Sequence, residues 1–163
     1  MLQCISGSME MSEGKVHWQC NEAEVDKEQI FKKISIAAPY LEVIEEMTAT
    51  EFLHFHQQFK KLLSGISVEE ILAIVDLEKA ADKQIRYYSS GMKQRVKLAQ
   101  AIFLEAPLLL LDEPCTNLDT KGIELYHHLI EKYCQGKTII VSSNDENEYS
   151  FCREKINIMD YKK

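Results

Sequence analysis

The sequence lacks a long apolar stretch, a CxxC pair, internal repeats and low-complexity segments. No apolar run approaches the roughly 20 residues that a helix needs to cross a bilayer. The first residues also lack the positive segment followed by an apolar one that marks a secretory signal. The five cysteines are an odd number, and no histidine has a partner at metal-ligand spacing. These absences argue against a membrane-spanning chain, a disulfide scaffold and a metal site, and they favour reduced thiols in a cytosolic protein.

Basic residues are also too few for a general nucleic-acid footprint. The chain has 19 Lys and Arg against 26 Asp and Glu, which gives a net charge of −7, and the acids are spread over the whole length. We therefore expect no nucleic-acid partner, although a local basic patch is compatible with these numbers. The 163 residues, 45% of them apolar, suit one soluble domain with a real core.

The most informative stretch runs from Tyr88 to Asp119. Ser89 and Ser90 are predicted to start an amphipathic helix, because apolar residues then recur at helical spacing as far as Phe103. The run of four leucines at 108–111 predicts a short strand that is buried on both faces of a parallel sheet. Asp112 and Glu113 follow this run directly. Two acids at the end of a buried strand are costly unless they meet a cation or a reacting water.

Short apolar runs and capping residues predict further elements along the chain. The predicted strands, besides the leucine run, are 14–18, 34–38, 137–142 and 155–159. The predicted helices are the end of one at 1–6, a turn at 27–31, and the segments 49–63, 68–75, 122–134 and 146–152. Thr48 with Glu51, and Ser67 with Glu70, have the spacing of capping boxes. The alternation of predicted strands and helices along the chain implies right-handed crossovers and a mostly parallel sheet, which is an α/β fold.

Three blocks in this stretch resemble motifs of the ATP-binding-cassette (ABC) ATPases. The segment 88–92 is similar to the signature motif, with Tyr-Ser-Ser-Gly-Met in place of the usual Leu-Ser-Gly-Gly-Gln. The segment 108–113 is similar to the Walker B strand, and 117–119 to the D-loop that follows it. Walker B alone is a common pattern, whereas the three blocks in this order are specific. The resemblance implies a P-loop-NTPase-like sheet flanked by helices, with an inserted helical subdomain at about 40–105 and core segments at 106–163.

The resemblance also implies roles for individual residues in binding ATP and Mg²⁺. Asp112 would hold Mg²⁺, and Glu113 would polarise the water that attacks ATP. Ser89, Ser90, Gly91 and Met92 would face the γ-phosphate of a nucleotide held by a second ATPase domain, and Asp119 would link the two sites. Asn144 stands where the switch histidine is expected; it can hydrogen-bond a phosphate but carries no proton at neutral pH.

The phosphate-binding loop of the family, GxxxxGK[S/T], has no match in the 163 residues. Val16 follows the Gly14-Lys15 pair, and Glu131 stands where the first glycine before Gly136-Lys137 belongs. We therefore expect a partial cassette domain that is incomplete at its N-terminus and is inactive alone. Pro39 and Tyr40 also occupy the place of the Q-loop glutamine, which puts that metal and water contact in doubt.

The function that this resemblance predicts is that of the ATP-hydrolysing subunit of an ABC membrane transporter. Such a subunit would pair head to tail with a second ATPase domain, contact a transmembrane permease, and lie peripherally on the cytoplasmic face of the cell membrane. One alternative is a soluble ABC protein of DNA repair or translation, which long heptads or a second cassette would mark. Another is a non-catalytic or degenerate subunit that completes a partner's ATP site. Pro39, Asn144 and the missing loop favour this alternative, whereas Glu113 argues against it.

Overall fold

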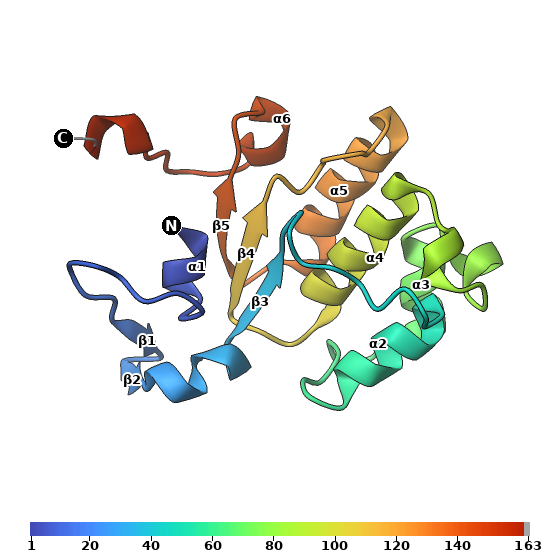
Figure 1. Ribbon diagram of the computed structural model, residues 1–163, viewed down its shortest axis with the longest axis horizontal. Coiled ribbons are helices and arrows are strands. Elements are labelled where there is room, and N and C mark those ends of the chain that lie inside the picture. Colours follow the sequence, from blue (N-terminus) through green and yellow to red (C-terminus); the bar gives the residue numbers. More distant parts are fainter. Residues whose placement is uncertain (162–163) are drawn as a thin grey trace.

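A three-stranded parallel sheet lies between a thick helical layer and a thin layer formed by the N-terminal segment (Figure 1). This arrangement is seen in a computed structural model, which describes residues 1–161. The strand order is β3–β4–β5, with β3 at Ile34–Ala37, β4 at Leu108–Asp112 and β5 at Thr138–Ser142. The α/β class is therefore confirmed, and so are the three strands predicted at 34–38, 108–111 and 137–142.

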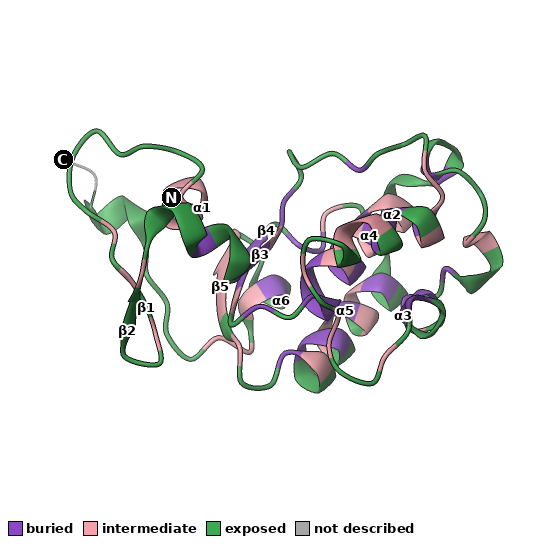
Figure 2. Ribbon diagram, turned by 90° about the horizontal axis from the view of Figure 1, so that it is seen from below, coloured by how far each residue is buried: buried purple, intermediate pink, exposed green. Residues whose placement is uncertain are grey.

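The thick layer is built from the helices that connect these strands. Between β3 and β4 the chain forms α2 (Ala49–Gln57), α3 (Val68–Ile74) and α4 (Ser90–Phe103), with the 3₁₀ turns η2 (Glu78–Ala80) and η3 (Ile85–Tyr87) before α4. Between β4 and β5 it forms α5 (Thr120–Tyr133). Helices α4 and α5 cover one face of the sheet, and α2 and α3 lie beyond α4 (Figure 1). Buried residues gather in this half of the molecule (Figure 2).

The central strand is buried on both faces, as its four leucines predict. Leu109, Leu110 and Leu111 each have 0% of their surface exposed. Successive side chains of a strand point to opposite faces. Accordingly, Leu109 and Leu111 belong to the large core under α4 and α5, whereas Leu110 packs with Leu2 and Ile30 on the other side.

The thin layer contains α1 (Leu2–Ile5) and an antiparallel hairpin of β1 (Trp18–Cys20) and β2 (Ala23–Val25). The 3₁₀ turn η1 (Lys27–Lys32) follows and confirms the turn predicted at 27–31. The strand predicted at 14–18 is wrong, because the extended chain begins at Trp18 and joins the hairpin instead of the parallel sheet. Gly14, whose φ of +86° lies outside the extended region, cannot begin such a strand.

Two other predicted elements differ from the structure. The helix predicted at 49–63 ends at Gln57, because the chain turns to pair with the end of α4: the Leu63 amide donates to the Phe103 carbonyl at 2.8 Å. Phe59 is consequently 69% exposed instead of lying on a buried side. The strand predicted at 155–159 is also wrong; a 3₁₀ turn, η4 (Ile158–Tyr161), stands there without a neighbouring strand among the described residues.

The helix starts agree with the capping patterns in the sequence. Thr48 and Glu51 exchange both bonds of a capping box at α2, at 3.1 and 2.9 Å. Ser67 does the same with Glu70 at α3, at 3.2 and 2.8 Å. A short helix, α6 (Glu146–Tyr149), follows β5. Among residues 1–161, no helix combines the length and the apolar character that spanning a bilayer requires.

Candidate functional site

The carboxyl ends of the three parallel strands meet at one edge of the sheet. The register pairs Ala37 with Leu111 and Asp112 with Ser142, so the chain leaves β3, β4 and β5 at the same height. Asp112, the following Glu113, and Asn144 two residues beyond β5 are thereby placed at this edge. In open α/β sheets, ligands bind outside the carboxyl ends of the strands. The candidate site is therefore this edge.

Glu113 leaves the end of β4 in an unusual backbone conformation. Its φ is +43°, in the left-handed region that residues other than glycine seldom adopt. Its amide donates to the Ser142 carbonyl at 2.9 Å, and its side chain is exposed. A left-handed non-glycine residue costs about 1 kcal/mol or more, and such residues cluster at functional sites.

Asp112 is half-buried, and no donor within residues 1–161 hydrogen-bonds to its carboxylate. Tyr40 lies near it, as the electrostatics show: partial burial, and then the charge of Asp112, raise the pKa of the Tyr40 hydroxyl. The described residues contain no group of three or more His, Cys, Asp or Glu that could hold a metal unaided. A free carboxylate at a ligand-binding edge nevertheless fits Mg²⁺, which is commonly held by one or two carboxylates together with water and substrate phosphates.

The predicted signature segment forms the exposed start of α4. The Ser89 hydroxyl accepts from the Met92 amide at 3.2 Å, which confirms the predicted cap. Ser89 and Ser90 are both exposed. A Cβ added at Gly91 would lie 3.0 Å from the Asn117 carbonyl oxygen, so a larger residue here would press on the backbone of the predicted D-loop. The start of α4 is thus packed against the predicted D-loop.

Two side chains of α4 extend this contact; both belong to the segment 89–95 that resembles the signature motif, but the sequence assigned them no role of their own. Buried Gln94 donates through Nε2 to the Pro114 carbonyl at 2.7 Å. Arg95 lies between two acids, with Nη1 2.9 Å from Asp76 Oδ2 and Nη2 3.8 Å from Asp119 Oδ1. The residues after Asp112 are therefore fixed against the helix that begins with the signature segment.

Asp119 has a local role in addition to the predicted one. Its Oδ1 accepts from the Gly122 amide at 2.8 Å and so caps α5. Asn144 is exposed, and the next residue, Asp145, caps α6 by accepting from the Asn147 amide at 2.9 Å. The Asn144 side chain is therefore available to a ligand at the sheet edge.

Glu148 in α6 is a further residue that sequence reasoning missed. Its side chain is buried, its Oε1 accepts from the Cys115 amide at 2.7 Å, and its backbone carbonyl accepts from the Tyr126 hydroxyl at 2.8 Å. Burial raises the pKa of this carboxyl. It is one of three acids in the four residues 145–148, a pattern too common to select one of them.

The predicted residues thus form two groups that are joined by the loop 113–119. Asp112, Glu113 and Asn144 stand at the sheet edge, whereas the segment 89–92 and Asp119 stand at the start of α4. Within residues 1–161 no hydrogen bond or ion pair joins the two serines to the acid pair. Each group includes exposed side chains, and both groups contact the loop 113–119.

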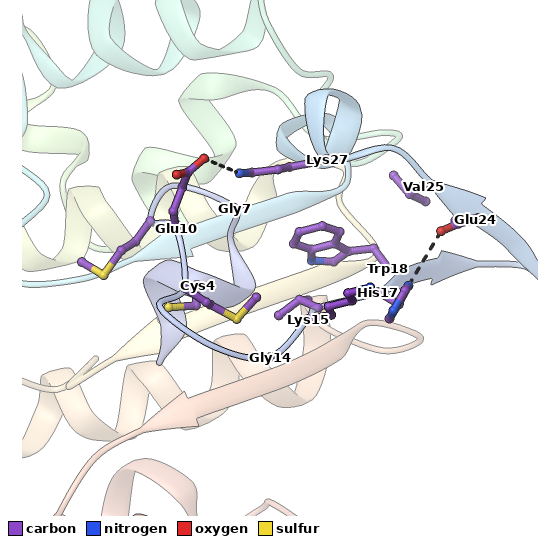
Figure 3. Close-up of a pocket in the computed structure, with 13 residues that line it drawn as sticks. Cys4, Gly7, Glu10, Gly14, Lys15, His17, Trp18, Glu24, Val25 and Lys27 are labelled. Carbon is purple, nitrogen blue, oxygen red and sulfur yellow. Dashed lines mark hydrogen bonds and ion pairs between the residues drawn. The ribbon is translucent and has the colours of Figure 1, made fainter.

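A separate hollow of about 460 Å³ lies in the thin layer, beside α1 and the hairpin (Figure 3). Four of its polar side chains lie close to one another in pairs: Lys27 lies 3.3 Å from Glu10, and His17 lies 3.8 Å from Glu24, whereas Lys15 also lines the hollow. The Trp18 indole already donates to the Ile5 carbonyl at 2.7 Å. The hollow includes none of the predicted site residues, so it offers no competing centre.

Comparisons with known proteins agree with this geometry. The family model described as "ABC transporter" matches residues 1–116. The "Uncharacterized ABC transporter ATP-binding protein YybJ" of Bacillus subtilis is 31% identical over 155 residues, covering 91% of this chain and 68% of the relative. The "Cytochrome c biogenesis ATP-binding export protein CcmA" of Haemophilus influenzae is 27% identical, covering 99% and 77%. Among solved structures, a dimeric ATP-binding cassette bound to ADP and Pi in a post-hydrolysis state has a TM-score of 0.75 at 26% identity, covering 92% of this chain and 71% of that one.

Proposed function

Because this chain belongs to the ABC transporter family of ATP-binding cassettes, we propose that it acts as an ATP-hydrolysing subunit of a membrane transporter. Its ATP sites are shared with a second cassette. One observation carries the proposal: the signature segment and the strand end that bears the acid pair are both held against the loop 113–119, by the close approach of Gly91 to Asn117 and by the Gln94–Pro114 hydrogen bond. In this arrangement the signature segment completes the nucleotide site of the partner cassette, and the acid pair belongs to a second nucleotide site.

The acid pair serves the hydrolytic side of the site. Asp112 holds Mg²⁺, which when bound polarises phosphate oxygens. Glu113 is the general base, and its exposed carboxylate at the sheet edge suits a group that must orient a water. Asn144 donates a hydrogen bond from its amide to the γ-phosphate. The absence of a titratable proton at Asn144 makes proton transfer the task of Glu113.

The signature segment 89–92 serves the partner's nucleotide. Exposed serine hydroxyls stand here at the first turn of a 14-residue helix, whose free amides and dipole favour an anion. Gly91 lets this helix start approach the Asn117 carbonyl, and Asp119 is linked to the same helix through Arg95. The solved relative described above is dimeric, which supports a pair of cassettes, and the head-to-tail arrangement of that pair is part of this proposal.

The membrane partner is a permease contacted by the helical subdomain at about 40–105. Two aromatic side chains of this segment are exposed, with Phe59 69% and Tyr87 62% accessible, so they are available for a contact with another subunit. The named relatives are ATP-binding proteins of transporters and exporters. The chain then lies on the cytoplasmic face of the cell membrane, held there by the permease.

The first test replaces the general base in the assembled transporter. Glu113→Gln keeps the size of the side chain but removes its charge, so the ATPase rate should fall by about a hundredfold or more. Glu131→Gln is the matched control, because Glu131 is exposed in the last turn of α5, from which the chain continues to the start of β5 and not to the strand ends that bear the site. ATPase rates of the two purified complexes, measured at saturating ATP, decide the matter.

The second test addresses the 163-residue chain alone. Without a GxxxxGK[S/T] segment among these residues, calorimetric titration with Mg-ATP should detect no binding tighter than about millimolar. Micromolar binding would contradict the expectation that the 163-residue chain is inactive alone.

A second candidate function is a subunit that completes a partner's site without hydrolysing ATP itself. Asn144 and Tyr40, which stand where the family has a histidine and a glutamine, favour it. Under this alternative, Glu113→Gln leaves the ATPase rate unchanged, whereas Ser89→Ala or Gly91→Ala lowers it.

A further inference from the structure

We propose that Glu148 is a positioning residue, which holds the backbone after β4 so that Glu113 keeps its left-handed conformation and directs its carboxylate at the sheet edge. The proposal rests on the ATPase function proposed above. It adds a residue for which no sequence motif of the resemblance assigns a role.

The starting point is the strain at Glu113. A φ of +43° for a glutamate persists only where the surroundings determine the backbone from several sides. If the following residues were free to turn, Glu113 would relax to an ordinary conformation and its carboxylate would point elsewhere. The question is which contacts prevent that.

The backbone of 113–115 is held by partners from three different elements. The Glu113 amide donates to the Ser142 carbonyl at 2.9 Å, at the end of β5. Pro114 has no amide hydrogen, and its carbonyl accepts from Gln94 of α4 at 2.7 Å. The Cys115 amide donates to Glu148 of α6 at 2.7 Å. Since Pro114 contributes no donor, the Glu148 bond is the first amide anchor after Glu113.

Glu148 is itself fixed in place. It is 4% exposed, and the hydroxyl of fully buried Tyr126 donates to its backbone carbonyl at 2.8 Å. Its second carboxylate oxygen, Oε2, has no hydrogen-bond partner within residues 1–161. The Cys115 amide is the hydrogen-bond donor to this buried carboxylate, and the neighbouring Ser143 hydroxyl also favours its charged form.

Burying a carboxylate in this way is costly for stability. An apolar side chain of similar volume commonly packs in such a place at lower cost, since a buried charge loses its hydration. Ser143, Asp145, Glu113 and Cys115 are the polar or titratable groups that face Glu148, and the two neighbouring acids make its charge more costly still. In this proposal the buried carboxylate is kept because it fixes the backbone of 113–115.

The experiment begins with the 163-residue chain and its backbone. Glu148→Ala removes the acceptor, so exchange of the Cys115 amide hydrogen should accelerate by about tenfold or more. The Glu113 carbon chemical shifts should move away from left-handed values. Glu148→Gln retains an acceptor oxygen and should keep exchange within about threefold of the parent. Glu146→Ala, on the same helix but exposed, is the control and should change neither measurement.

The same variants in the assembled transporter give the functional readout. Glu148→Ala should lower kcat by about tenfold to a hundredfold while KM for ATP stays within about threefold, because the base is misplaced but nucleotide contacts remain. Glu148→Gln should restore most of kcat. If Glu148→Ala fails to fold, Glu148→Asp takes its place, since it keeps the charge but shortens the reach to Cys115.

Two results would overturn the proposal. One is a Cys115 exchange rate that Glu148→Ala leaves unchanged; the other is faster exchange with an unaltered kcat, which would make Glu148 merely structural. A wrong assignment of the ATPase function would be recognised separately, because Glu113→Gln would then leave the ATPase rate unchanged. The exchange rate of the Cys115 amide would still show whether Glu148 holds the backbone.

Discussion

The two faces of one sheet are buried against very different amounts of protein. On the helical face, α4 and α5 enclose Leu109 and Leu111 in a core that also includes Phe103 and Tyr126. On the opposite face, Leu110 meets little more than the four-residue helix α1, Ile30 and the hairpin. Several apolar side chains near this thin layer and the C-terminal turn are exposed, among them Met9, Ile156, Met159 and Tyr161.

This difference in packing between the two faces corresponds to which elements hold the site in place. The contacts that hold 113–115 come from Gln94 of α4, Ser142 of β5 and Glu148 of α6, and Glu148 is held in turn by Tyr126 of α5. None of these contacts comes from the thin layer. A site that needs a strained backbone is thus supported by the part of the molecule that packs most closely.

The largest expected difference is in the free energy of unfolding, between alanine variants of two neighbouring leucines of β4. Leu111→Ala should lower the free energy of unfolding by about 4 kcal/mol, because the surrounding helices cannot collapse into the cavity. Leu110→Ala should lower it by about 2 kcal/mol, because the thin layer can move inward. Urea unfolding of both variants measures the difference. Equal losses would show that the two layers pack equally well.

A smaller effect compares two capping residues. Ser67 starts α3 in the thick layer with both bonds of its capping box, so Ser67→Ala should lower the free energy of unfolding by about 1 kcal/mol. Asp26 caps only an exposed 3₁₀ turn in the thin layer, accepting from the Glu28 amide at 3.1 Å. Asp26→Ala should cost about 0.5 kcal/mol or less, at the low end for such caps. Thermal melts followed by circular dichroism suffice, and a reversed order would contradict the comparison.

The last comparison leaves the fold unchanged and measures how fast the cysteine thiols of the two layers are labelled. Burial raises the pKa of Cys115 to about 12 and that of Cys134 to about 11, both in the thick layer. Because the thiolate is the reactive form, both should remain unlabelled by iodoacetamide at pH 8 in the folded chain. Cys4 and Cys20 of the thin layer are partly exposed and should react first. Mass spectrometry of a time course reads the order, with the urea-unfolded chain as the control that labels at every position.

The same contrast separates the predictions that succeeded from those that failed. Helix starts at 49, 68 and 90, and the strand at the four leucines, lie in or against the thick layer and were confirmed. The wrong strands at 14–18 and 155–159 lie outside it, where the chain has few neighbours and apolar residues do not imply burial. The overextended helix at 49–63 failed because Leu63 pairs with the end of α4, a partner distant in sequence.

The sequence by itself determined what depends on near neighbours along the chain. Ser89 caps α4 and Thr48 caps α2 because a hydroxyl reaches an amide three residues on, and three of the four consecutive leucines are fully buried on the two faces of a sheet. It also placed Asp112 and Glu113 at the end of a strand, and their roles remain proposals. Only the tertiary structure decided that Gln94 and Glu148 meet the 113–115 backbone. Those contacts join residues 20 and 33 positions apart, and they form because a parallel sheet brings the ends of distant strands to one edge.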